Sequence, residues 1–97
     1  MNSYIFTMFT KSAGQVIVAF KPEAQKSDLE EVLGPYRHRK ILDLKFDLTA
    51  TRENQVLALT YLLKVPLEEE SSVVKELKTN YSAVIEYAYQ PSIRNMF

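Results

Sequence analysis

Four stretches of the chain alternate apolar and polar side chains with the two-residue period that is typical of β-strands. The clearest is Ile41–Asp47, where three apolar residues alternate with three charged ones. The other three are Gln15–Lys21, Val56–Val65 and Ala83–Tyr89. Pro22 and Pro91 follow the first and last of these stretches, where the missing N–H of proline interrupts a sheet ladder. We therefore predict four strands, with a polar hairpin loop over Leu48–Gln55.

Two further segments have the three- and four-residue spacing of amphipathic helices. In the first, Ser27 and Glu30 fit a capping box, and Gly34 followed by proline ends the helix. The second begins after Pro66 with three glutamates, carries lysines later and ends near Asn80, a charge order that the helix dipole favours. The apolar stripes of the two helices are Leu29, Val32 and Leu33, and Val73, Val74, Leu77 and Tyr81.

The predicted order is strand, helix, strand, strand, helix, strand. This order predicts an α+β domain of the ferredoxin-like split βαβ type (βαββαβ), with a four-stranded antiparallel sheet and both helices on one face. We place this domain at residues 15–91. Residues 1–14 are expected to be an N-terminal arm or an extra strand, and residues 92–97 a C-terminal tail.

The charge balance and the missing cysteines exclude several classes of function. Lys plus Arg and Asp plus Glu number 12 each, so the basic surplus that a nucleic-acid binder needs for phosphate contacts is missing. The absence of cysteine excludes disulfides, thiolate metal sites and cysteine nucleophiles. The apolar residues of the first ten positions have no basic residue before them and are too few for a signal peptide or a membrane span. We therefore expect no nucleic-acid partner and no membrane partner, and the compartment stays open.

The sequence offers no set of residues for catalysis. His38, the only histidine, lies in the basic turn Arg37–Lys40, where a solvated loop residue is expected and not a general base. Glu68–Glu70 point in different directions around a helix start, so they suit the helix dipole better than a cation. We predict no catalytic residue, no metal site and no cofactor. The basic turn has one alternative role, as a docking point for an acidic partner.

With both helices on one side, the opposite surface of the predicted sheet is uncovered. Small and apolar side chains point to it, with charged residues around them, as in a protein-docking surface. The last strand is expected to direct Ile85, Tyr87 and Tyr89 toward the helices. The alternatives are a half-solvated sheet, or a sheet covered by the N-terminal arm or by a second copy of the chain. The predicted partner-binding residues of this surface are Ile17, Ala19, Ala58, Thr60, Leu62, Glu86 and Ala88.

Three motifs in order carry a resemblance to subtilisin-type propeptides. The run Gln15–Pro22 is similar to the family's opening strand, an apolar run that ends in Phe-Lys. Leu63–Pro66, followed by an acidic helix start and by Val74–Leu77, resembles its third strand, proline and second helix. Ala83–Tyr87 resembles the beginning of its last strand. The resemblance spans about residues 15–91.

The resemblance implies a propeptide-type inhibitor or chaperone of a subtilisin-like serine protease. In that family the uncovered sheet face docks on two protease helices, and the C-terminal tail enters the active-site cleft. The chain departs from the family pattern at Tyr89, Pro91 and Arg94, where the family presents a glutamate, an aspartate or asparagine, and an apolar residue. The predicted tail residues are Ile93, Arg94, Asn95, Met96 and Phe97.

Two functions of other classes remain open. One is a regulatory or structural module that self-associates through the outer sheet face or an edge strand, which a net charge near zero favours. The other is a small-molecule sensor of the same fold.

Overall fold

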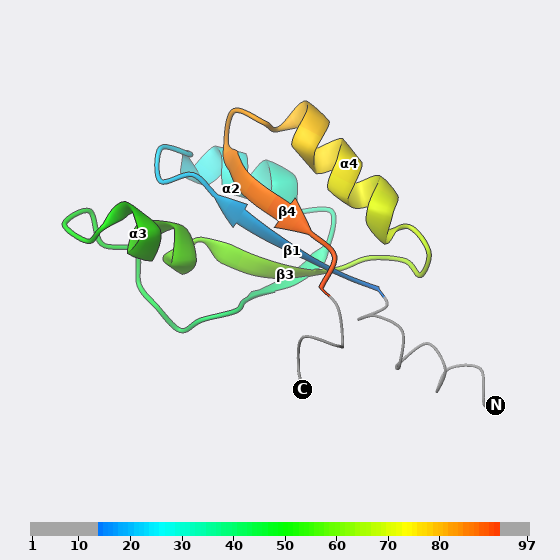
Figure 1. Cartoon of the computed structure of the whole chain (residues 1–97), viewed down its shortest axis with the longest axis horizontal. Helices are drawn as coiled ribbons and strands as arrows, with labels where there is room; N and C mark the ends of the chain where they lie inside the picture. Colours follow the sequence, from blue (N-terminus) through cyan, green and yellow to red (C-terminus); the bar gives the residue numbers. More distant parts are fainter. Residues whose placement is uncertain (1–13, 92–97) are drawn as a thin grey trace.

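The computed structural model describes residues 14–91, which form an α+β unit of four strands and three helices. The predictions for the N-terminal arm and for the tail lie outside these residues. Figure 1 shows α2 behind the sheet and α3 at one end of it. In chain order the elements are β1 Gln15–Phe20, α2 Lys26–Leu33, β2 Arg37–Lys40, α3 Arg52–Ala58, β3 Thr60–Lys64, α4 Glu70–Asn80 and β4 Ile85–Tyr89.

The four strands make one antiparallel sheet in the order β2-β3-β1-β4. β1 is central: Val16 faces Leu63 on β3, and Val18 faces Ala88 on β4. Because β1 and β2 are joined through α2 but separated by β3, the order is compatible with the split βαβ arrangement that the sequence predicts.

The main core lies between one face of the sheet, called here the helix face, and the helices α2 and α4. Val16, Val18 and Phe20 of β1 are fully buried on this face, as their alternation predicts. They meet Val32 and Leu33 of α2 and Val73 and Leu77 of α4. The predicted apolar stripes of both helices are therefore confirmed. Figure 1 shows α4 beside β4 along its length.

The first helix begins earlier than the predicted capping box. Its N-cap is Gln25, and the Asp28 carboxylate accepts the Gln25 backbone N–H at 2.9 Å. The box over Ser27 and Glu30 is wrong because Asp28 is already three residues beyond a usable cap, and a carboxylate there is the stronger acceptor. The end of the helix at Leu33, with Gly34 as its C-cap, is as predicted.

The second strand lies outside the stretch with the clearest alternation. β2 is Arg37–Lys40, paired with β3 so that Arg37 faces Lys64 and Lys40 faces Tyr61. The predicted strand Ile41–Asp47 is wrong: after the Ile41 N–H donates to the Thr60 carbonyl at 3.1 Å, the chain has passed the beginning of β3. A strand needs a neighbour as well as a pattern, and β3 is too short to supply one.

β3 is short because its predicted first half is a helix. The prediction of a strand over Val56–Val65 is confirmed for Thr60–Lys64 and wrong for Val56–Ala58, and the loop predicted over Leu48–Gln55 contains the beginning of α3. Thr51 caps α3 by accepting the Asn54 backbone N–H at 3.2 Å. A threonine in this position competes well for the orphan N–H groups of a helix start, so the polar stretch becomes a helix. α3 makes a third helix that the sequence analysis does not predict.

The last strand contains a β-bulge at Glu86. Ala19 of β1 faces Tyr87, but the next residue, Phe20, faces Ile85, so one extra residue is inserted on β4. The inward position of Ile85 is as predicted. Beyond the bulge the phase reverses, so Ala88 enters the core and Tyr87 and Tyr89 point away from it. The prediction that both tyrosines face the helices is wrong for this reason.

None of the helices within residues 14–91 has the length and apolar character needed to cross a membrane.

Candidate functional site

The sheet face opposite the helix face is called here the open face. The pairing register places a mixed set of side chains on it, because residues that face one another across an antiparallel ladder share a side. This set contains apolar, aromatic and basic groups. Its members are Ile17, Ala19, Arg37, Arg39, Thr60, Leu62, Lys64, Tyr87 and Tyr89.

Four of the residues predicted for a docking surface lie on the open face: Ile17, Ala19, Thr60 and Leu62. Ala58 and Ala88 do not: Ala58 is buried in α3, at its last residue, and Ala88 faces Val18 in the core. Glu86, the exposed bulge residue near the beginning of β4, lies at the end of the open face that α3 covers, where it lines a groove.

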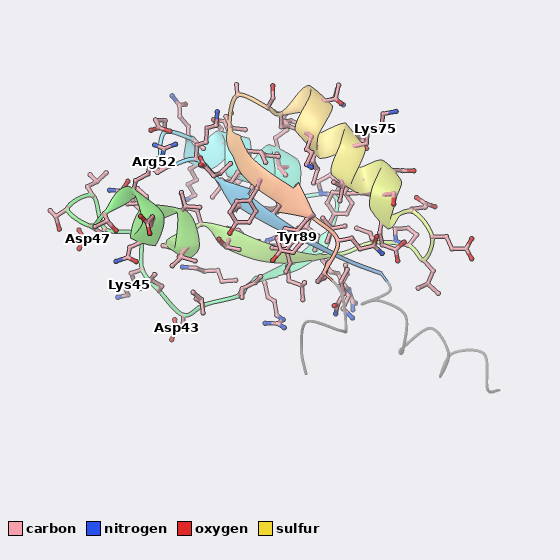
Figure 2. All side chains as sticks on the ribbon, in the orientation of Figure 1. Asp43, Lys45, Asp47, Arg52, Lys75 and Tyr89 are labelled. Carbon is pink, nitrogen blue, oxygen red and sulfur yellow. The ribbon has the colours of Figure 1, made fainter. Side chains whose placement is uncertain are left out.

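Of the charged residues that the prediction placed around this surface, Lys64 lies on the open face, but three others do not. Asp43, Lys45 and Asp47 belong to the segment between β2 and α3, so they make no rim of the sheet. Figure 2 shows them along this segment, at the margin of the molecule.

α3 covers one end of the open face. Ala19 is fully buried there, and the Thr60 hydroxyl donates to the Val56 carbonyl at 2.8 Å, which fixes the last turn of the helix onto β3. A groove of about 450 Å³ remains between α3 and β4. Its lining is Arg52, Glu53, Val56, Leu57, Glu86 and Tyr87.

Arg52 joins α3 to the two strands at this end. Its guanidinium donates to Glu23, which follows β1, at 2.7 Å and to Glu86 of β4 at 3.0 Å. The hydrogen bond from Arg52 holds the pKa of Glu23 below its ordinary value. All three side chains are solvated, so the bridge positions α3 more than it stabilises the fold.

No helix within residues 14–91 lies over the other end of the open face. Tyr87, at the edge of the groove beside α3, and Tyr89, beyond that groove, are 38% and 46% exposed, with ring centroids 5.9 Å apart. Ile17 faces Tyr89 across one ladder and Leu62 across the other. Figure 2 shows Tyr89 where β4 ends, beside the uncovered strands. The result is an aromatic and aliphatic strip that crosses three strands.

A basic row borders this strip on the side of β2. Arg39 faces Leu62, and Arg37 faces Lys64, so three cations lie next to the apolar residues. All three are exposed. The open face therefore carries tyrosines on one edge strand, aliphatic side chains on the two central strands and arginines on the other edge strand.

Sequence reasoning missed the tyrosines and the arginines of this site. The tyrosines were assigned to the core because the bulge that turns them outward leaves no local mark in the sequence. The four basic residues of β2 have no apolar–polar alternation, because all of them are exposed. The sequence analysis therefore placed them in a turn between a helix and a strand.

His38 contacts two tyrosines near β2. The Nδ1 atom of His38 lies 3.0 Å from the Tyr36 carbonyl, and its ring packs edge-on against Tyr61. Among residues 14–91, no three metal-ligating side chains gather in one place. Two other shallow grooves lie beside α4 and β4, and between α2 and Tyr61, at about 390 and 310 Å³.

Comparison of the chain with family models, with curated proteins and with solved structures gives no match. The open face is therefore interpreted from its own chemistry.

Proposed function

We propose that this chain is a non-catalytic protein-binding domain with a ferredoxin-like split βαβ fold, and that its partner docks on the uncovered end of the open face. The observation that carries the proposal is the pair Tyr87 and Tyr89, half-exposed on one edge strand of a face whose other edge strand carries Arg39. Tyrosine and arginine are the residues that protein interfaces favour, and tyrosine gives a large contact area for little lost conformational entropy.

A subtilisin-like serine protease is the first partner to test. The resemblance of Gln15–Pro22 and Ala83–Tyr87 to subtilisin-type propeptides supports it, since those domains dock through the same side of the sheet. Because α3 already lies over Ala19 and Thr60, the partner would contact only the uncovered end of the open face. In the sequence, the tail residues 92–97 come two residues after the end of β4, the strand that carries both tyrosines.

The test is the residual activity of a subtilisin-like protease titrated with the purified full chain. We expect inhibition in the wild type, and a loss of at least about tenfold in affinity when both tyrosines are replaced, Tyr87→Ala with Tyr89→Ala. The matched control is Leu67→Ala, which truncates a more exposed apolar side chain in the β3–α4 connection. It should leave inhibition unchanged.

A second variant without the last four residues separates the two parts of the mechanism. If the tail enters the protease cleft, this variant should still bind the protease but inhibit it less. Absence of binding and of inhibition by the wild-type chain at high micromolar concentration would exclude a protease as the partner. Equal losses in the tyrosine variant and in Leu67→Ala would exclude the open face as the docking surface.

A further inference from the structure

Residues 41–48 contain a bend at residues 41–42, a stretch over residues 43–47 that belongs to no helix, strand or turn, and the start of a turn at Leu48; their apolar side chains are exposed. Leu44 and Phe46 are 37% and 38% exposed, and Leu48 is 81% exposed. Within residues 14–91, no backbone–backbone hydrogen bond reaches residues 42–46. Figure 1 shows this segment running from β2 to α3 away from the sheet. Within residues 14–91 the segment therefore has the pattern of a strand but no neighbouring strand, and its backbone over residues 42–46 is engaged at the Leu44 carbonyl, by the Lys40 side chain.

The two ends of the segment are held in place. The Lys40 ammonium group donates to the Leu44 carbonyl at 2.5 Å. At the far end, the Asp47 carboxylate accepts the backbone N–H and the hydroxyl of Thr49, at 2.9 and 2.8 Å, in a turn that leads to α3. A segment held at both ends has lost part of its conformational freedom before any partner arrives, which lowers the entropy cost of pairing.

From this geometry we infer that residues 42–46 pair with the same residues of a second copy of the chain, as antiparallel strands with Leu44 on the two-fold axis. This register places Asp43 of each copy opposite Lys45 of the other, and Leu42 opposite Phe46. Opposite charges and apolar pairs that face each other directly across strands are both stabilising. A single self-complementary segment is what a two-fold interface requires.

Neighbouring registers fit less well. With Lys45 on the axis, two lysines face each other and Asp43 faces Asp47, and both contacts are repulsive. With Phe46 on the axis, Lys45 faces Asp47, but Asp47 is already engaged by Thr49 and the chain turns there. The Leu44 register instead joins Asp43 to Lys45, which belong to none of the ion pairs within residues 14–91.

The interface is small. Five paired residues bury less surface than the roughly 1,200–2,000 Å² of a stable complex, so we expect dissociation constants of about 10 μM to 1 mM. Sedimentation velocity of the full chain over this concentration range should show a monomer–dimer equilibrium. A strict monomer at about 1 mM would overturn the inference.

A charge exchange tests the register. Asp43→Lys alone places lysine opposite Lys45, and Lys45→Asp alone places aspartate opposite Asp43, so each variant should dimerise at least about tenfold more weakly than the wild type. Mixed together, the two variants restore both opposite-charge pairs, and a heterodimer should form. Both residues are exposed, and matching melting temperatures would verify the fold. Dimerisation of each variant at wild-type strength, or failure of the mixture, refutes this pairing.

Because the chain has no cysteine, a single introduced thiol reports the axis directly. In the Leu44 register the two copies of residue 44 face each other about 4.5–5.5 Å apart between Cα atoms, within disulfide reach. Leu44→Cys should therefore cross-link on oxidation. The control Leu48→Cys places its two thiols about 27 Å apart along the strands and should not. Equal cross-linking of both would overturn the assignment.

These experiments do not depend on the open face. The double variant Tyr87→Ala with Tyr89→Ala should dimerise like the wild type, and the charge variants should keep any protease inhibition. A dimer lost with the tyrosines and insensitive to the charges would place self-association on the open face and exclude residues 42–46.

Discussion

Glu70, the first residue of α4, is 6% exposed, and its carboxylate accepts the backbone N–H of Gly14 at 2.5 Å. This contact joins the beginning of the central strand to the beginning of a core helix, 56 residues apart in sequence. The same carboxylate also lies at the positive end of the α4 dipole. Replacing Glu70 therefore perturbs two elements that both line the main core.

The structure sets the size of the effect. A hydrogen bond to a buried charged group contributes about 1.5–3 kcal/mol, and a buried donor left without an acceptor costs about 1–3 kcal/mol. We expect Glu70→Ala to lower the free energy of unfolding by about 2–3 kcal/mol. Glu70→Gln keeps an oxygen for the Gly14 N–H but loses the charge, so we expect about 1 kcal/mol.

Urea unfolding measures these differences from the shift of the midpoint, if the slope stays that of the wild type. In a domain of this size, 1 kcal/mol corresponds to about 4–8 °C in melting temperature, which gives a second measurement. The control is Glu69→Gln, the exposed N-cap neighbour without a side-chain capping bond, which should change stability by less than about 0.5 kcal/mol. If Glu69→Gln and Glu70→Gln are equally destabilising, the effect is one of overall charge, and the reasoning about burial fails.

Two further predictions concern the covered end of the open face and the turn before α3. Thr60→Val should lower the free energy of unfolding by about 1 kcal/mol, because the hydrogen bond from the Thr60 hydroxyl to the Val56 carbonyl is lost. Thr60→Ser keeps the hydroxyl and should be closer to the wild type. Urea unfolding measures both variants, and a valine variant more stable than the wild type would contradict the prediction. The bonds from Thr49 hold the pKa of Asp47 below its ordinary value. The turn is therefore favoured above about pH 4 and loses this contribution as the pH falls through the lowered pKa; NMR titration should show the pKa rising in Thr49→Ala.

The parts of the fold that the sequence predicted are those where one local pattern meets one buried environment. Val16, Val18 and Phe20 alternate on a central strand, so the period of two survives folding. Val73 and Leu77 repeat at helical spacing on α4 and reach the same core. At these positions propensity, pattern and packing agree, so the sequence alone is sufficient to predict which side chains are buried.

The parts that failed depend on partners that lie far away in the sequence. The alternation over Ile41–Asp47 is genuine, but β3 begins only at Thr60. The strand therefore has no residue left to pair with this segment beyond Ile41. The apolar residues from Val56 onward fit a helix turn as well as a strand. The N-cap at Thr51 favours the helix. The direction of Tyr87 depends on one inserted residue that only the pairing with β1 reveals.

The bulge at Glu86 makes the composition of the open face depend on residue count more than on residue type. If Glu86 stayed and the pairing became regular, the stretch Tyr87–Tyr89 would rotate by half a turn relative to Ile85, and two aromatic rings would compete for the core position of a single alanine methyl group. Deletion of Glu86 removes the extra residue and keeps the present directions of Tyr87, Ala88 and Tyr89. An insertion or a deletion after Glu86 should therefore be tolerated far less than the loss of Glu86 itself, because the number of residues in this strand sets the surface and the core together.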